Sequence, residues 1–149
     1  MKGLKWLGLL GVVVLIGVAV VTALDMGEKS PVFVSGTIQI NDDLKADATG
    51  VETLFVIVYD EASAMPMPYG AMKEKMPADL SSPVPFLVTK ESLRIMNPDA
   101  PAPKFLRLKV RIDRDGVAGP DQPGDLTGGA EHVPFGQRDI QVLVDKKAQ

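Results

Sequence analysis

The sequence predicts an all-β domain, built as an antiparallel β-sandwich, that follows an N-terminal transmembrane helix. Three observations support this prediction. Residues 7–24 form one uninterrupted apolar run, whereas the later apolar runs are short, rich in β-branched residues and often alternate with polar ones. Prolines and glycines separate these short runs. No amphipathic stretch in the sequence extends beyond a few helical turns, so no long helix is expected after the apolar run.

The apolar run 7–24 has the length needed to cross the hydrocarbon core of a bilayer. Lys2 and Lys5 precede it, and no acidic residue does. Because positive charge stays on the cytoplasmic side, residues 1–6 are predicted to form a cytoplasmic tip. The rest of the chain is then exported.

A polar linker at 25–31 connects this anchor to the predicted periplasmic β-sandwich domain at 32–146. The predicted location is the inner (cytoplasmic) membrane, crossed once, with the C-terminal domain in the periplasm. An alternative is a signal peptide that is cleaved after Ala23. Both interpretations export the same domain.

The first half of the domain contains two predicted strands. Residues 32–40 are rich in β-branched side chains and alternate from Val34 onward, and the continuous apolar run 54–59 indicates a central strand buried on both faces. Residues 41–50 are polar and end on glycine, which is typical of a loop or a single helical turn. Five prolines within 62–85 argue against a long helix and against a central strand there.

Three more strands are predicted in the second half, at 86–89, 105–112 and 140–144. Prolines and glycines make 97–103 and 119–129 loops. The strand 105–112 alternates cleanly, with three basic residues facing outward and four apolar residues facing inward: Leu106, Leu108, Val110 and Ile112. Short strands separated by turn residues favour a sandwich of the Ig-like or cupredoxin-like kind.

The composition excludes several classes of function. Lys2 and Lys5 precede the exported part, which therefore carries 14 of the 16 basic residues and all 19 acidic ones, a net charge of −5 (14 − 19). An acidic domain does not attract nucleic acid. The chain has no cysteine, which excludes thiol–disulfide exchange and zinc–thiolate sites. Its one histidine, His132, lies in a loop-like sequence, so no catalytic residue, cofactor or metal is predicted and the chain is not expected to be an enzyme.

Four methionines gather within the proline-broken segment 65–77. Thioethers are soft ligands that suit Cu(I), so a periplasmic Cu(I)-binding carrier is one hypothesis. Flexible thioethers also fill gaps in a core or offer an adaptable apolar surface to a partner, and we favour this interpretation. The residues predicted to contact a partner are Met65, Met67, Pro68, Tyr69, Met72 and Met76.

The segment 120–126 predicts a rigid turn formed by Pro123, Gly124 and Asp125. Pro-Gly supports a tight turn with positive φ at the glycine, and Asp121 and Asp125 are able to hydrogen-bond to nearby backbone. Acidic side chains here also raise the question of Ca²⁺, but the regular ligand spacing of a calcium loop is absent. We therefore favour a structural role.

The order of several short segments resembles that of one protein family. The segments are Val-Ser-Gly-Thr-Ile at 34–38, Leu-Phe-Val at 54–56, Met-Pro-Met-Pro at 65–68, Arg-Asp-Gly at 114–116, Pro-Gly-Asp-Leu at 123–126 and Val-Leu-Val-Asp at 142–145. In this order they resemble the C-terminal periplasmic domain of c-type cytochrome biogenesis proteins of the CcmI/CycH kind. The resemblance covers 32–146. The helical tetratricopeptide array that usually precedes this domain has no counterpart between 24 and 32.

The resemblance implies a tethered module that serves haem-lyase assembly and holds partners without catalysing a reaction. The predicted function is therefore a membrane-anchored periplasmic binding or assembly module, in c-type cytochrome maturation or a related respiratory complex. Its expected partners are the membrane, through the helix, and haem-lyase or respiratory components. Contact is expected either through 65–77 or through an exposed strand edge, to which an extended segment adds as an extra strand. The alternative is the Cu(I) carrier.

Overall fold

The computed structural model describes residues 30–64 and 67–149. The predicted tip and anchor, most of the predicted linker, and Met65 lie outside the described residues. Within the described ranges, no helix is long and apolar enough to cross a membrane. The chain divides into two compact units, and the second, Pro31–Gln149, is the domain described below.

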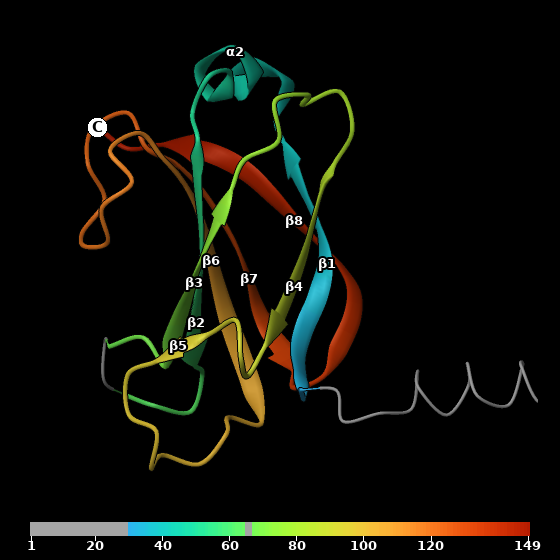
Figure 1. Cartoon of the computed structure of the whole chain (residues 1–149), viewed down its shortest axis with the longest axis vertical. Helices are drawn as coiled ribbons and strands as arrows, with labels where there is room; N and C mark the ends of the chain where they lie inside the picture. Colours follow the sequence, from blue (N-terminus) through green and yellow to red (C-terminus); the bar gives the residue numbers. More distant parts are fainter. Residues whose placement is uncertain (1–29, 65–66) are drawn as a thin grey trace, which may run out of the picture. The chain divides into compact units, whose positions relative to one another are not determined.

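The domain is all-β, as predicted (Figure 1). One curled sheet contains the eight strands of the described residues in the order β4-β1-β8-β7-β6-β2-β3-β5. Neighbouring strands are antiparallel except for β1 and β8, which run parallel, so the sheet is mixed rather than purely antiparallel. The strands are β1 (Val32–Ile40), β2 (Thr53–Asp60), β3 (Gly70–Lys75), β4 (Val84–Thr89), β5 (Arg94–Ile95), β6 (Phe105–Asp113), β7 (Leu126–Pro134) and β8 (Gln137–Lys147).

Three predicted features of the chain are confirmed. The polar segment after β1 forms single helical turns, η1 (Asp42–Leu44) and α2 (Lys45–Ala48). Strand β2 is buried on both faces from Leu54 to Val58, and only Tyr59 of the predicted run 54–59 is half-buried. The four alternating apolar residues of β6 all lie in the core: Leu106, Leu108, Val110 and Ile112.

The prediction that no central strand lies within 62–85 is wrong. Strand β3 occupies this range and lies between β2 and β5 in the sheet. The prolines of this range fall outside β3, which leaves a proline-free window long enough for a strand. Pro85 lies within β4, an edge strand, where a missing N–H is tolerated.

The predicted loop 119–129 ends earlier than expected, because β7 begins at Leu126. Gly128 belongs to this strand, and a Cβ placed on it would lie 2.0 Å from the carbonyl oxygen of Leu143 in β8. Glycine is therefore needed at this position because the backbones of β7 and β8 approach each other closely, and not because the chain turns there. His132 also lies within β7, with a φ of 53°, where the register between β6 and β7 shifts. The loop setting predicted for it is wrong.

Candidate functional site

A groove lies between β3 and β4, where the two ends of the curled sheet approach each other without pairing. One hollow, of about 740 Å³, is lined by 50–52, 75–78, Val84 and Pro85. A second, of about 370 Å³, continues along β3 and β4 and shares Lys75, Val84 and Pro85 with the first. We call the two hollows together the β3–β4 groove.

The wall formed by β3 has unpaired backbone groups. Strand β5 pairs only with Gly70 and Ala71, which leaves 72–75 without a strand on that side among the described residues. The N–H of Met76 donates to the carbonyl of Glu52 at 2.8 Å, in register with the β2–β3 ladder. Antiparallel pairs alternate between bonded and non-bonded, so the even-numbered residues of β3 bond to β2.

The odd-numbered residues of β3 therefore direct their backbone groups away from β2. Ala71 meets β5 in this way, in register with the bond from the Met96 N–H to the Tyr69 carbonyl. Lys73 and Lys75 follow Ala71 in the same alternation, so their N–H and C=O groups also point away from β2, and Lys75 lines both hollows of the β3–β4 groove. Two residues of β3 are thus available to pair with an added strand.

The other wall and the floor are apolar. Pro85 of β4 has no N–H to offer at this edge, and β4 forms the wall opposite β3. Leu87 is 51% exposed on β4. Beneath the groove, Met72 and Phe86 are buried in the core. The groove therefore combines a polar backbone edge with an apolar base.

A tight turn closes one end of the groove. The Thr89 N–H donates to the Ser92 hydroxyl at 2.9 Å, and the Ser92 N–H donates to the Thr89 hydroxyl at 3.1 Å. This turn carries the chain from β4 directly to β5, so that β5 reaches across to β3. Gly70 allows the close packing, because a Cβ there would lie 2.7 Å from Cγ of Leu93. The unpaired part of β3 is therefore only 72–75.

The structure separates the predicted contact residues. Met72 and Met76 are buried in the core, which is the packing role considered beside partner binding. Four residues apart along a strand, they are separated by about 13 Å and cannot bind one Cu(I) ion together. Met67 is 58% exposed. Pro68 and Tyr69 are half-buried, and Tyr69 packs on Phe33 with ring centroids 5.9 Å apart.

The predicted turn has the expected local geometry. Gly124 has a φ of 93°, and the buried carboxylate of Asp125 accepts the Gln122 N–H at 2.8 Å. Pro123 precedes the glycine, at a position that favours proline in tight turns. Within the described residues, no group of three or more His, Asp or Glu side chains is arranged to hold a metal ion.

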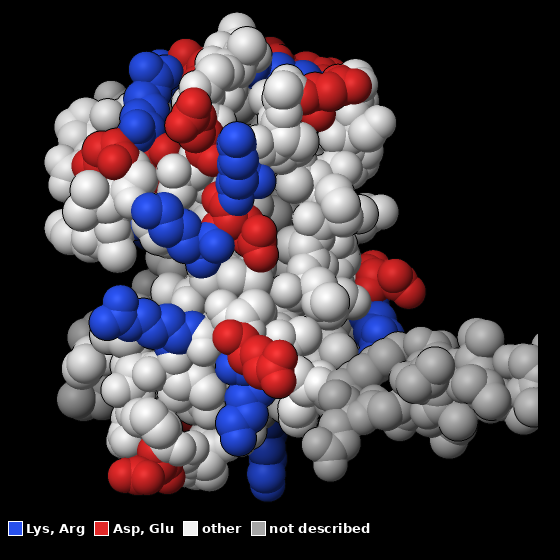
Figure 2. All heavy atoms as spheres, in the orientation of Figure 1, with Lys and Arg blue, Asp and Glu red and all other residues white. Residues whose placement is uncertain are grey.

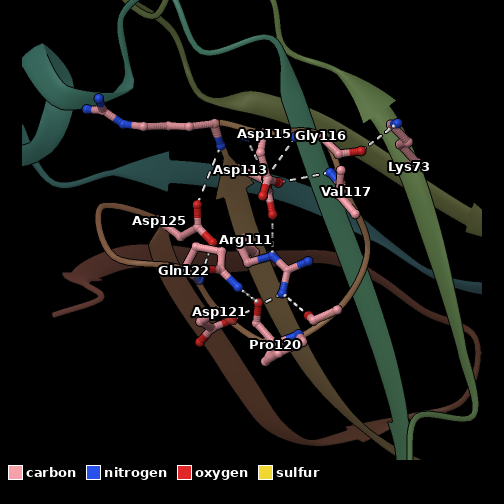
Figure 3. A network of polar contacts seen from close by, with 12 residues as sticks. Lys73, Arg111, Asp113, Asp115, Gly116, Val117, Pro120, Asp121, Gln122 and Asp125 are labelled. Atoms are coloured by element: carbon pink, nitrogen blue, oxygen red, sulfur yellow. Dashed lines mark hydrogen bonds and ion pairs between the residues drawn. The ribbon is translucent and has the colours of Figure 1, made fainter.

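Sequence reasoning missed the centre of the polar network shown in Figure 3, which is Arg111. The prediction placed its side chain on the outer face of β6, but the loop after β6 covers it and leaves it 2% exposed. Its Nη1 donates to the Gly119 carbonyl at 2.6 Å and to Asp121 Oδ1 at 3.2 Å. Its guanidinium carbon lies 4.9 Å from the ring centroid of Phe55. A basic residue facing outward gave no signal of this burial.

The carboxyls of this network titrate differently. Burial raises the pKa of Asp113, and a hydrogen bond to Asp115 adds to the rise. That hydrogen bond lowers the pKa of Asp115, which is exposed. Burial also acts to raise the pKa of Asp121, but hydrogen bonds from Lys109 and Arg111 outweigh it and the net pKa is lowered. The contacts of this network hold the loop after β6 against the outer face of the sheet.

The surface charges do not form one basic patch on the face drawn in Figure 2, where basic and acidic side chains are interspersed. A binding site on this face must therefore rely on shape and backbone groups rather than on an electrostatic field of one sign. The β3–β4 groove provides both. No family model matches the chain, and neither a curated protein nor a solved structure matches it significantly.

Proposed function

We propose that this chain is a membrane-anchored periplasmic binding and assembly module that holds an extended segment of a partner in the β3–β4 groove. One observation carries the proposal: Lys73 and Lys75 direct unpaired backbone groups away from β2, and Lys75 lines a hollow with an apolar floor. An extended peptide that adds to such an edge gains affinity from main-chain hydrogen bonds and specificity from alternate side chains. The role is non-catalytic.

The groove suits a partner other than a second copy of this chain. Lysines at a strand edge discourage two identical edges from pairing, because like charges would be brought together. Lys73 and Lys75 flank the edge here, and both are exposed. A guest segment of about four residues, with an apolar side chain directed to the floor, fits the free edge at 72–75.

Two sequence features support the pathway that we propose. The predicted anchor at 7–24 would raise the effective concentration of the domain for partners in the same membrane. The order of short segments resembles the periplasmic domain of c-type cytochrome biogenesis proteins. We therefore propose that the partner is a haem-lyase or respiratory component in c-type cytochrome maturation or a related complex.

We also propose that the curled sheet is a β-sandwich of the Ig-like or cupredoxin-like kind. Its support is the β3–β4 groove itself, since Leu54 and Met72 line the same hollow as Val84 and Phe86. These residues come from opposite parts of the strand order. The two ends of the sheet thus lie across one core from each other.

A proline substitution at the free edge tests the binding proposal. Lys75→Pro removes the outward N–H, while Lys75→Ala removes the same charge and keeps the N–H. The full anchored chain is captured from membranes after cross-linking through a single cysteine introduced at Ala78, which lines the groove. We expect a partner adduct with Lys75→Ala and at least a tenfold loss with Lys75→Pro.

The natural absence of cysteine makes this cross-link specific to the introduced site. Val117, which is 63% exposed in the loop after β6, provides the control position. Equal adducts from Ala78→Cys and Val117→Cys would refute the groove as the binding site. Equal adducts with Lys75→Pro and Lys75→Ala would refute recognition through the β3 backbone.

A further inference from the structure

Exposed apolar side chains gather at one end of the sheet. Among the described residues, Met67, Met96, Phe105 and Phe135 are large, apolar and between 37% and 58% exposed, and we call this set the apolar end. The Phe135 N–H donates to the Lys104 carbonyl at 2.9 Å, which places Phe135 beside Phe105. Exposed apolar patches of this kind mark contact surfaces.

Ring contacts and backbone bonds connect the members of the apolar end. The rings of Phe33 and Phe135 have centroids 4.7 Å apart, and Tyr69 packs on the other side of Phe33. The Met96 N–H donates to the Tyr69 carbonyl at 2.9 Å. Phe135 thus contacts Phe33, a buried residue at the beginning of β1, and Met96 is linked to Phe33 through Tyr69.

The described chain begins at this same end. The Lys90 N–H donates to the Pro31 carbonyl at 3.1 Å, and the Gly136 N–H donates to the Phe33 carbonyl at 2.7 Å. Figure 1 shows the start of β1, the start of β8 and strand β5 at this end of the sheet. Between the predicted anchor and Pro31 only 25–30 intervene, which span at most about 20 Å when fully extended.

We infer that the apolar end rests in the interfacial layer of the membrane that holds the anchor. This inference depends on the anchoring part of the proposed function. The short tether keeps the beginning of β1 within reach of the bilayer surface, and the exposed apolar side chains of the apolar end gain by leaving water. The anchor supplies the first attachment and raises the effective concentration of the apolar end at the bilayer surface.

With the apolar end at the membrane, the β3–β4 groove has a defined orientation relative to the bilayer. The turn that closes the groove, with Ser92 after β4, is next to Lys90 and hence to the apolar end. The other end of the groove is lined by Pro77 and Ala78. The groove would therefore open away from the membrane, toward a partner segment that extends into the periplasm.

Fluorescence quenching on the full chain tests the inference. Single cysteines at Met96 and Phe135 are labelled with a nitrobenzoxadiazole probe, and the protein is reconstituted in phosphatidylcholine–phosphatidylglycerol vesicles with nitroxide-bearing lipid. Val117→Cys and Leu143→Cys serve as controls, because both side chains are exposed and apolar but lie outside the apolar end. We expect at least threefold stronger quenching at positions 96 and 135 than at 117 and 143.

The outcomes separate this inference from the proposed function. Flotation of the chain with its vesicles tests the anchor, and a chain that does not float refutes both the anchor and the membrane seat. A chain that floats, with equal quenching at all four positions, refutes the seat alone. Met96 provides an independent reading if substitution of Phe135 disturbs its packing on Phe33, since Met96 is 56% exposed.

Discussion

The Nε of Arg111 lies 2.8 Å from Oδ2 of Asp113, and neither side chain is more than 2% exposed although both belong to the outer face of the sheet. Their contact is an ion pair without hydrogen-bond alignment, and neither atom has another partner. The pair is buried by the loop after β6 rather than by the main core. A small buried region therefore lies between the outer face of β6 and the loop that covers it.

Replacing Arg111 with alanine should destabilise the domain by about 3–5 kcal/mol, because Asp113 would keep a buried charge without its partner. Packing on the ring of Phe55 would also be lost. Urea unfolding of the two proteins measures the difference. The control is Lys109→Ala, which breaks a partly exposed pair with Asp121 and should cost about 1 kcal/mol or less.

The double variant R111M/D113N separates the cost of leaving a buried charge unpaired from the cost of losing buried side-chain volume. It removes both charges and keeps much of the volume, so most of the stability lost in Arg111→Ala should return. If Arg111→Ala alone costs no more than Lys109→Ala, the buried pair does not stabilise the loop.

Asp121→Asn should reduce stability at neutral pH but have little effect in acid. The folded-state pKa of Asp121 is lowered despite its partial burial, because Lys109 and Arg111 donate hydrogen bonds to it. Its contribution is present above the unfolded pKa of about 3.9 and is lost as pH falls through the folded value. Urea unfolding from pH 7 to pH 3 should show the difference between wild type and variant shrinking. A difference that does not change with pH contradicts this.

For Asp113→Asn, the stability difference between wild type and variant should change with pH in the opposite direction. Burial raises the folded-state pKa of Asp113, so the folded protein binds this proton more tightly than the unfolded chain. The stability of wild type relative to the variant should therefore increase as pH falls through the folded pKa toward about 3.9. Urea unfolding over the same pH range measures this difference. If the differences for Asp113→Asn and Asp121→Asn change with pH in the same direction, one of the two pKa directions is wrong.

Met72→Ala should cost about 2–5 kcal/mol, because it leaves a cavity in a core where Met72 is 2% exposed. Met67→Ala provides the matched control on an exposed side chain and should change stability by about 0.5 kcal/mol or less. Thermal and urea unfolding measure both. Equal effects of the two substitutions would show that Met72 is not a packing residue.

Gly128→Ala should destabilise the domain by more than about 3 kcal/mol, or prevent folding, because the new Cβ would lie 2.0 Å from the Leu143 carbonyl oxygen. The β7 and β8 backbones would have to separate. Gly50→Ala is the control, since no atom lies within 4 Å of its added Cβ and only its φ of 81° opposes the change. A cost for Gly128→Ala no larger than that for Gly50→Ala would contradict the close approach.

Local patterns in the sequence predicted most of the strands, and long-range contacts explain what was missed. The alternation of 105–112 and the apolar run 54–59 depend only on neighbouring residues, so the sequence predicts both strands. The sequence does not predict strand β3, because Gly70–Lys75 is mostly polar or small and prolines lie on both sides of it. The burial of Arg111 depends on a loop that folds back over it, which no periodicity encodes.

The candidate site was predictable only in part. The segment 65–77 drew attention through its methionines, yet the structure buries Met72 and Met76 and leaves the backbone of the same segment available. A free strand edge follows from strand order, which a single sequence does not reveal. The sequence therefore predicts strand addition without indicating which edge is free.

The parallel pairing of β1 and β8 has a mechanical consequence. Both strands run from the same end of the sheet, so the first residue of β1 and the last residue of β8, Val32 and Lys147, lie at opposite ends of adjoining strands. A pull applied between the two chain ends would load the hydrogen bonds from Val34 to Ile40 together, in shear, instead of opening them one after another. The domain should therefore resist a tensile load better than an unzipping hairpin of equal stability.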